Sequence, residues 1–219
     1  MCGRFSILDD LDKICERFNC YSQQRDFEPR YNVAPSQEVP VVICHRGRTI
    51  LKNMRWGLIP HWAREGKTGN RLINARIETI REKPSFRSSF RHKRCIIPAN
   101  GYYEWQKTGG GEKLPYRIML ESRELFAMAG LWDQWVDENG RAWFSFAIVT
   151  TDAAEAVQTI HNRMPFILQE EQEQLWLQGA PDADLLQMLE PARRLIAYRV
   201  SRLVNSPAHD VPACIEELG

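Results

Sequence analysis

Residues 101–121 read GYYEWQKTGGGEKLPYRIMLE, which has the pattern of a β-hairpin. The two ends of this stretch, 101–106 and 116–121, are short runs rich in residues that favour strands. Between them, Thr108 and the glycines at 109–111 provide a turn. We therefore predict two antiparallel strands joined by a loop here, and not a boundary between two domains.

Runs of the same kind recur along the chain. They are residues 39–45, 49–56, 94–98, 125–132, 143–150 and 194–200. Strands that follow one another through short turns, with few helices between them, argue against a doubly wound parallel sheet. We predict an α+β fold: one domain over residues 1–219, built on a curved, mainly antiparallel β-sheet with a barrel-like core and peripheral helices.

The helices expected around this sheet are short. Near the N-terminus, Ser6 and Asp9 resemble a capping box, and apolar residues then follow at helical spacing, at Leu8, Leu11, Ile14 and Phe18. Further helices are predicted at 152–160, 170–178 and 183–189.

The composition is that of an ordinary globular chain, with 43% hydrophobic and 26% charged residues. No apolar run approaches the roughly 20 residues that span a bilayer. The N-terminus, MCGRFSILDD, lacks the plan of a signal peptide, so we expect a cytoplasmic protein. The six cysteines have no C-x-x-C pair, and neither they nor the five histidines have zinc-ligand spacing. We expect reduced thiols, no metal and no cofactor.

Charge is unevenly distributed along the chain. Residues 64–94 contain ten basic and three acidic side chains, a net charge of +7, whereas the rest of the chain has a net charge of −6. A solvated basic face would explain this segment. A surface for the phosphates of nucleic acid would explain it equally well from charge alone.

Cys2 offers the most reactive chemistry. If Met1 is removed, Cys2 becomes an N-terminal aminothiol. With a pKa near 7.7–8.0, roughly one α-amine in seven is neutral at pH 7, against about one lysine amine in 2,500. The amine adds to an aldehyde to give an imine, and the adjacent thiol closes on the same carbon to give a five-membered thiazolidine. Position alone also fits an ordinary second residue.

Eight short blocks, in order along the chain, carry a resemblance to a known family. They are MCGRF at the N-terminus, YNVAP (31–35), WGLIP (56–60), NARIET (74–79), RCIIP (94–98), GYYEW (101–105), AGLW (129–132) and HNRMP (161–165). Each block is weak alone, but their order resembles the SOS-response-associated peptidase (SRAP) family from residue 2 to Asn205.

That resemblance implies a single-domain protein with a positively charged channel that binds abasic sites in single-stranded DNA. It implies a covalent crosslink through Cys2 to the ring-opened sugar, in the DNA damage response. It also implies autoproteolytic, peptidase-like processing of the N-terminus and reversal of the crosslink. From the imine chemistry we add an expected lyase side activity, and we expect association with the nucleoid when the protein acts on DNA. The mature chain is expected to begin at Cys2.

The resemblance assigns three partners to Cys2, each with a simpler alternative. Asn74 matches an active-site asparagine whose amide holds the sugar or the cysteine terminus; otherwise it caps a loop. Glu104 lies between aromatic residues, where a carboxyl acquires a raised pKa and transfers protons; otherwise it faces water. His161 is suited to opening the sugar ring; otherwise it caps the C-terminus of the helix predicted at 152–160.

Other matched residues are expected to bind DNA. Arg4, Arg76 and Arg163 are expected to grip phosphates, and Trp62 to stack on a base. Asn32 and Pro35 match the family's loop near the abasic nucleotide.

Three hypotheses follow for the function. The leading one is an enzyme that forms a thiazolidine crosslink with abasic single-stranded DNA. The second is a thiol-dependent peptidase of the N-terminal-nucleophile kind that acts on other proteins. The third is a non-catalytic reader of modified DNA in which Cys2 is incidental. We expect a monomer without membrane contact, and partners at the replication fork cannot be deduced from the sequence.

Overall fold

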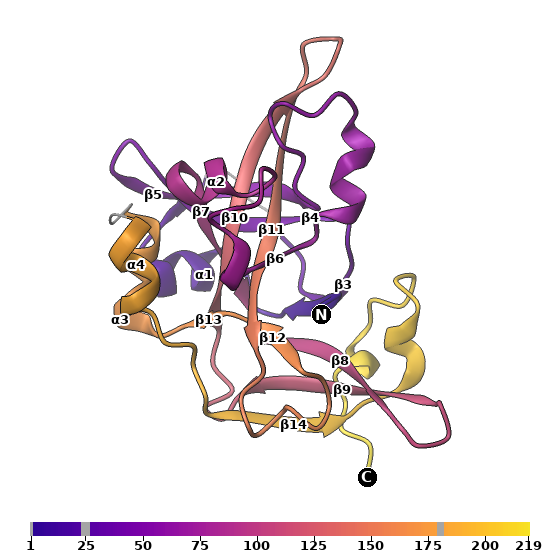
Figure 1. The fold of residues 1–219 in the computed structure, drawn as a ribbon. Coiled ribbons are helices and arrows are strands. Elements are labelled where there is room, and N and C mark those ends of the chain that lie inside the picture. The colour runs from indigo at the N-terminus through magenta and orange to yellow at the C-terminus, as the bar shows by residue number, and fades with distance from the viewer. Residues whose placement is uncertain (1, 23–26, 179–181) are drawn as a thin grey trace.

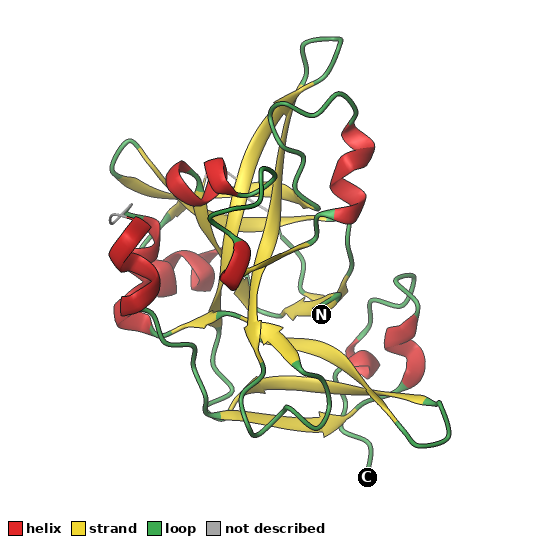
Figure 2. Ribbon diagram, in the orientation of Figure 1, coloured by secondary structure: helices red, strands yellow, loops and turns green. Residues whose placement is uncertain are grey.

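The computed structural model describes residues 2–22, 27–178 and 182–219, which form two β-sheets with helices outside them (Figures 1 and 2). Met1, whose removal the leading hypothesis requires, lies outside the described residues. In Figure 1 the N-terminus lies between a barrel and a second sheet beneath it. The α+β class, the barrel-like core and the peripheral helices are confirmed.

Five strands close into a barrel in the order β11-β10-β7-β4-β5, and β5 pairs with β11 to complete the ring. They are β4 (Glu38–His45), β5 (Arg48–Trp56), β7 (Arg94–Ala99), β10 (Phe126–Val136) and β11 (Ala142–Asp152). The pairing of β5 with β11 is parallel, and the other neighbours in the ring are antiparallel. Four short strands extend this sheet: β2 (Tyr21–Ser22), β6 (Asn74–Arg76), β12 (Arg163–Pro165) and β13 (Ile167–Leu168).

The second sheet is antiparallel and has the order β14-β9-β8-β1-β3. Its strands are β1 (Arg4–Ile7), β3 (Arg30–Val33), β8 (Gly101–Lys107), β9 (Lys113–Leu120) and β14 (Leu195–Arg199). The hairpin predicted at 101–121 is therefore confirmed as β8 and β9. The other six predicted runs also coincide with strands, namely β4, β5, β7, β10, β11 and β14.

Helices and helical turns connect these strands. The α-helices are α1 (Leu11–Phe18), α2 (Arg87–His92), α3 (Glu170–Leu177) and α4 (Asp182–Met188). The 3-10 turns are η1 (Gly66–Arg71), η2 (Ile77–Thr79), η3 (Arg202–Asn205) and η4 (Pro212–Cys214). α3 and α4 confirm the helices predicted at 170–178 and 183–189. No helix among the described residues is long and apolar enough to cross a membrane.

Aromatic packing joins the two sheets. Trp56 of β5 is fully buried and contacts Phe5 of β1 edge-to-face, with ring centroids 5.0 Å apart. On the barrel side, Trp56 stacks with Phe146 of β11 at 6.3 Å. Because aromatic pairs of this geometry bury large apolar areas, β1 is fixed against the barrel only a few residues after Cys2.

Two predicted helical features are wrong. α1 is capped by Asp10, whose side chain accepts a hydrogen bond from the Lys13 amide at 2.9 Å, and not by a capping box at Ser6 and Asp9. Ser6 lies in β1, where its hydroxyl donates to Gly101 O. Ser6 therefore cannot cap a helix that begins at Leu11.

The helix predicted at 152–160 is also absent, because β11 continues to Asp152 and the chain then forms consecutive turns. Val157 and Ile160 are buried at these turns. Val157 and Ile160 are three positions apart, as apolar residues on one face of a helix would be, but here turns bury them.

Candidate active site

Cys2 lies inside the molecule, directly before β1. It is fully buried, and its thiol lies 3.6 Å from Arg4 O as a hydrogen-bond donor. Burial raises the pKa of this thiol well above its usual range, and the nearby carboxylate of Glu104 raises it further. The thiol is therefore protonated near neutral pH and needs a proton acceptor before it reacts.

Strand pairing brings Glu104 to this cysteine. In the β1–β8 register, Arg4 lies opposite Tyr103, so the residues just before Arg4 continue alongside Glu104. The Glu104 side chain is only 3% exposed. Burial raises its pKa to about 7, which suits a group that both accepts and donates protons near neutral pH.

Asn74 holds the cysteine from the barrel side. It begins β6, which pairs in parallel with β11 opposite Ile148. Its amide nitrogen donates a 2.8 Å hydrogen bond to Cys2 O. Its amide oxygen is buried and has no hydrogen-bond partner among the residues described. Asn74 therefore fixes the backbone of Cys2 and has an acceptor available for a further donor.

His161 lies in the loop before β12 and completes the group. The Arg163 amide donates to Nδ1 at 3.0 Å, so in the neutral ring the proton lies on Nε2. Nε2 lies 3.9 Å from a carboxylate oxygen of Glu104. Nδ1 also lies 3.2 Å from Arg163 O, which a protonated ring could use as an acceptor. Burial lowers the pKa of His161, which favours the neutral ring in the free protein.

A groove of about 460 Å³ opens beside this pair. Its lining residues are Glu104, Trp105, Lys107, Lys113, His161 and Asn205. The four residues predicted to be catalytic thus come from four separate parts of the chain and meet where the two sheets join. Among the described residues, no cluster of three histidine, cysteine, aspartate or glutamate side chains could hold a metal ion.

Arg4 and Asn32 both anchor the C-terminal segment, and their predicted contact with DNA stays a prediction. The Arg4 guanidinium donates to Asn32 Oδ1 at 2.9 Å and to the carbonyls of Val204 and Asn205. Asn32 is fully buried and donates to three carbonyls of this segment, including His209 O at 2.7 Å. These contacts occupy both side chains within the protein.

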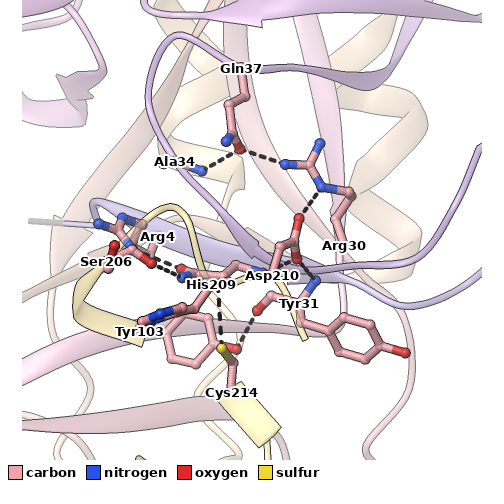
Figure 3. A network of polar contacts seen from close by, with 11 residues as sticks. Arg4, Arg30, Tyr31, Ala34, Gln37, Tyr103, Ser206, His209, Asp210 and Cys214 are labelled. Carbon is pink, nitrogen blue, oxygen red and sulfur yellow. Dashed lines mark hydrogen bonds and ion pairs between the residues drawn. The ribbon is translucent and has the colours of Figure 1, made fainter. Parts of the chain in front are cut away.

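Asp210 anchors the same segment from the other side, and the sequence analysis missed it. Its carboxylate accepts the amides of Tyr31 at 2.6 Å and Asn32 at 2.9 Å, and pairs with Arg30. The Tyr103 hydroxyl also donates to Tyr31 O, at 2.6 Å. Figure 3 shows these groups around β3. Asp210 and its partners in β3 are about 180 positions apart, so no local pattern in the sequence could have indicated their contacts.

Arg163 is occupied in a similar way. Its guanidinium forms a bidentate pair with Glu78 at 2.7 and 3.0 Å, and it also contacts Asp152 and Thr150 O. The residue is only 9% exposed. Because both terminal nitrogens have protein acceptors, the geometry favours a bracing role beneath His161 over a grip on phosphate.

The remaining predicted DNA contacts lie nearer the surface. Trp62 is 53% exposed and Arg76 is exposed, whereas Pro35 is partly buried. Gly57 turns the chain out of β5 towards Trp62 with a φ of +121°, and a Cβ there would lie 2.4 Å from Gly69 O, so only glycine fits. Contact of Trp62, Arg76 and Pro35 with DNA stays a prediction.

The basic segment 64–94 divides into exposed and buried charges. Arg87, Arg91 and His92 line a groove of about 580 Å³ together with His61, Trp62, Pro84 and Ser88. Arg94, in contrast, is buried and donates to Trp176 O and Phe90 O, and Lys93 pairs with the buried Asp133. Part of the +7 charge therefore stabilises the fold, whereas Arg87 and Arg91 are exposed in the groove.

Several known proteins are similar to this chain over most of its length. An abasic site processing protein, YoqW, from Bacillus subtilis (strain 168) is 45% identical over 222 residues, which cover 99% of each chain. The abasic site processing protein HMCES of Gallus gallus is 32% identical, over 86% of this chain and 66% of its own length. A solved structure of a protein from Bacteroides thetaiotaomicron superimposes with a TM-score of 0.88 at 30% identity, over 99% of this chain and 100% of the other.

The family model described as SOS response associated peptidase (SRAP) matches residues 1–207. The chain therefore belongs to the SRAP family.

Proposed function

We propose that this chain processes abasic sites in single-stranded DNA by forming a thiazolidine crosslink through Cys2 after Met1 has been removed. The observation that carries the proposal is the placement of Cys2, whose backbone is held by Asn74 and whose thiol lies near the carboxylate of Glu104. The names of the relatives, abasic site processing proteins, supply the substrate class.

The first step opens the abasic sugar. The hemiacetal C1′–O4′ bond breaks, the C1′ hydroxyl loses its proton, and O4′ gains one. His161 carries the proton of its neutral ring on Nε2, facing Glu104, so this pair can remove one proton and deliver the other. The product is an aldehyde at C1′.

The second step joins the aldehyde to the protein. The neutral α-amine of Cys2 adds to C1′, and the carbonyl oxygen leaves as water to give an imine. The thiol then transfers its proton to Glu104 while sulfur bonds to C1′, and the C=N electron pair returns to nitrogen, which takes up a proton. A Glu104 pKa of about 7 lets one carboxyl serve as acid in dehydration and as base in ring closure.

The proposal includes two lesser activities. Removal of the residue before Cys2 is assigned to self-processing, in line with the peptidase in the family description. An imine that fails to close is expected to promote β-elimination and strand cleavage, a lyase side activity.

Incubation of the mature protein with an abasic oligonucleotide tests the proposal. Wild type should give an adduct that survives denaturing electrophoresis, and intact mass should show a chain that begins at Cys2. Cys2→Ala should give only a labile imine, trapped by borohydride. Cys44→Ala is the control, because Cys44 is also a free cysteine and is more exposed than the buried Cys2. An equally stable adduct from Cys2→Ala would exclude the thiazolidine.

The peptidase and the non-catalytic reader are separated by two further measurements. Hydrolysis of a general peptide library that is lost in Cys2→Ala would favour a peptidase that acts on other proteins. Burial and the raised pKa of the Cys2 thiol argue against it, because they leave little thiolate to attack a peptide. Unchanged DNA binding without any covalent product would favour a reader.

A further inference from the structure

The groove beside Glu104 and His161 contains two lysines that the site chemistry does not use. Lys107 ends β8 and Lys113 begins β9, so they lie at the turn end of the hairpin. Both line the groove together with the Glu104–His161 pair. Both are exposed.

The two lysines face one another directly across the hairpin. Lys107 and Lys113 are partners in the β8–β9 register. Like charges directly opposite on paired strands destabilise a sheet. The acidic residue of the turn, Glu112, pairs with Arg202. Within residues 2–22, 27–178 and 182–219, neither lysine forms an ion pair that would offset the repulsion.

An anion placed between the two ammonium groups would remove their repulsion, and both lysines line the candidate active-site groove. We infer that Lys107 and Lys113 form a binding subsite for a DNA phosphate next to the abasic nucleotide. The inference rests on the proposed function, since the flanking phosphate belongs to the strand that Cys2 attacks. The segment 64–94, singled out by its charge, does not include these lysines.

Phosphate at this subsite would also act on the chemistry. The charged groups that act on His161 are the N-terminal amine, Glu104 and Lys107 from β8, and Arg163 from β12. Burial lowers the pKa of His161 most, and the positive charges of the N-terminal amine, Lys107 and Arg163 lower it further. A phosphate at Lys107 would offset one of these charges, so the imidazole would take up a proton more readily once DNA is bound.

The salt dependence of equilibrium binding tests the subsite without any covalent step. Binding of intact oligothymidine, which lacks an abasic site, is measured between low and moderate salt for wild type, Lys107→Gln, Lys113→Gln and the double variant. Each lost phosphate contact should reduce the slope of log K against log salt by about 0.7. Lys13→Gln is the matched control, because Lys13 is an exposed lysine on α1. Its slope should equal that of wild type.

Thermal unfolding gives an independent readout. Either single variant should raise the Tm by about 1–4 °C, because it removes the repulsion. Titration of His161 followed by NMR should show a higher pKa in Lys107→Gln, and a higher pKa in wild type when oligothymidine is added.

The outcomes separate this inference from the proposed function. An unchanged salt slope in the double variant overturns the subsite, even if wild type still forms its crosslink. A reduced slope supports the subsite, even if wild type forms no crosslink and the proposed chemistry fails. A wild-type chain that does not bind oligothymidine overturns the subsite, and the proposed function is then judged by its adduct with abasic DNA alone.

Discussion

Residues predicted to bind DNA lie in two contrasting environments. Arg4, Asn32 and Arg163 form a braced region in which side-chain nitrogens donate to protein acceptors. Trp62 and Arg76 form an open region in which the side chains face solvent. The contrast shows that a motif specifies which residue is present but not whether its polar atoms are already satisfied within the protein. Substitutions in the braced region should therefore affect folding, and those in the open region should affect DNA binding.

The largest effect is expected at Arg163. Arg163→Met removes four hydrogen bonds and leaves Thr150 O without its donor. We expect a loss of about 3–5 kcal/mol in the free energy of unfolding, measured by urea denaturation. Arg76→Gln should change the same quantity by less than about 0.5 kcal/mol. If both variants unfolded alike while only Arg163→Met lost DNA affinity, Arg163 would belong to the open region.

A pH-dependent effect is expected at Glu104. Its pKa is raised from the 4.5 of an ordinary glutamate to about 7, so its contribution to stability is complete below 4.5 and is lost as pH rises through about 7. Glu104→Gln stays neutral and should therefore exceed wild type by up to about 3 kcal/mol at pH 8, with little difference at pH 4. Urea denaturation at both pH values measures this. A difference that does not vary with pH would contradict a buried, titrating Glu104.

Trp62 should affect binding alone. Trp62→Ala removes an exposed ring, so the free energy of unfolding should change little. Loss of stacking on a base should weaken binding of single-stranded DNA by about 1–3 kcal/mol, measured by fluorescence anisotropy. A large loss of stability with unchanged DNA affinity would place Trp62 in the braced region.

The smallest effect is expected at Arg76. Arg76→Gln should lower the slope of log K against log salt by about 0.7, with no change in Tm. The test is a salt titration with oligothymidine at constant pH. A slope equal to that of wild type would mean that Arg76 contacts no phosphate.

Much of the fold could be predicted because strands leave a local record in the sequence. The hairpin at 101–121 and six other strands are visible as short runs of β-forming residues bounded by turns. The closure of the barrel is not visible in the sequence, because the parallel pairing of Arg55 with Ser145 joins strands that are far apart in the chain. The false helix at 152–160 arose because burial of Val157 and Ile160 at turns imitates helical spacing.

The structure brings together four residues that chemistry and motif order had named, Cys2, Asn74, Glu104 and His161, while their catalytic roles stay a prediction. The contacts that support this group could not be predicted. Nothing local in the sequence indicates that Arg4 contacts residues 204–205, because hydrogen bonds across 200 positions have no spacing rule. The lysine pair at 107 and 113 was accessible to inspection, since the two residues flank a turn already identified, but its meaning needed the neighbouring groove.

The contact between Arg4 and the carbonyls of Val204 and Asn205 also bears on biosynthesis. At about 5–20 residues per second, the ribosome adds these partners roughly 10–40 s after Arg4. During that interval the emerging N-terminus cannot yet have the burial that Cys2 has in the finished protein. Translation thus leaves the N-terminal segment accessible for a limited period, which ends when the last segment of the chain folds back onto the first.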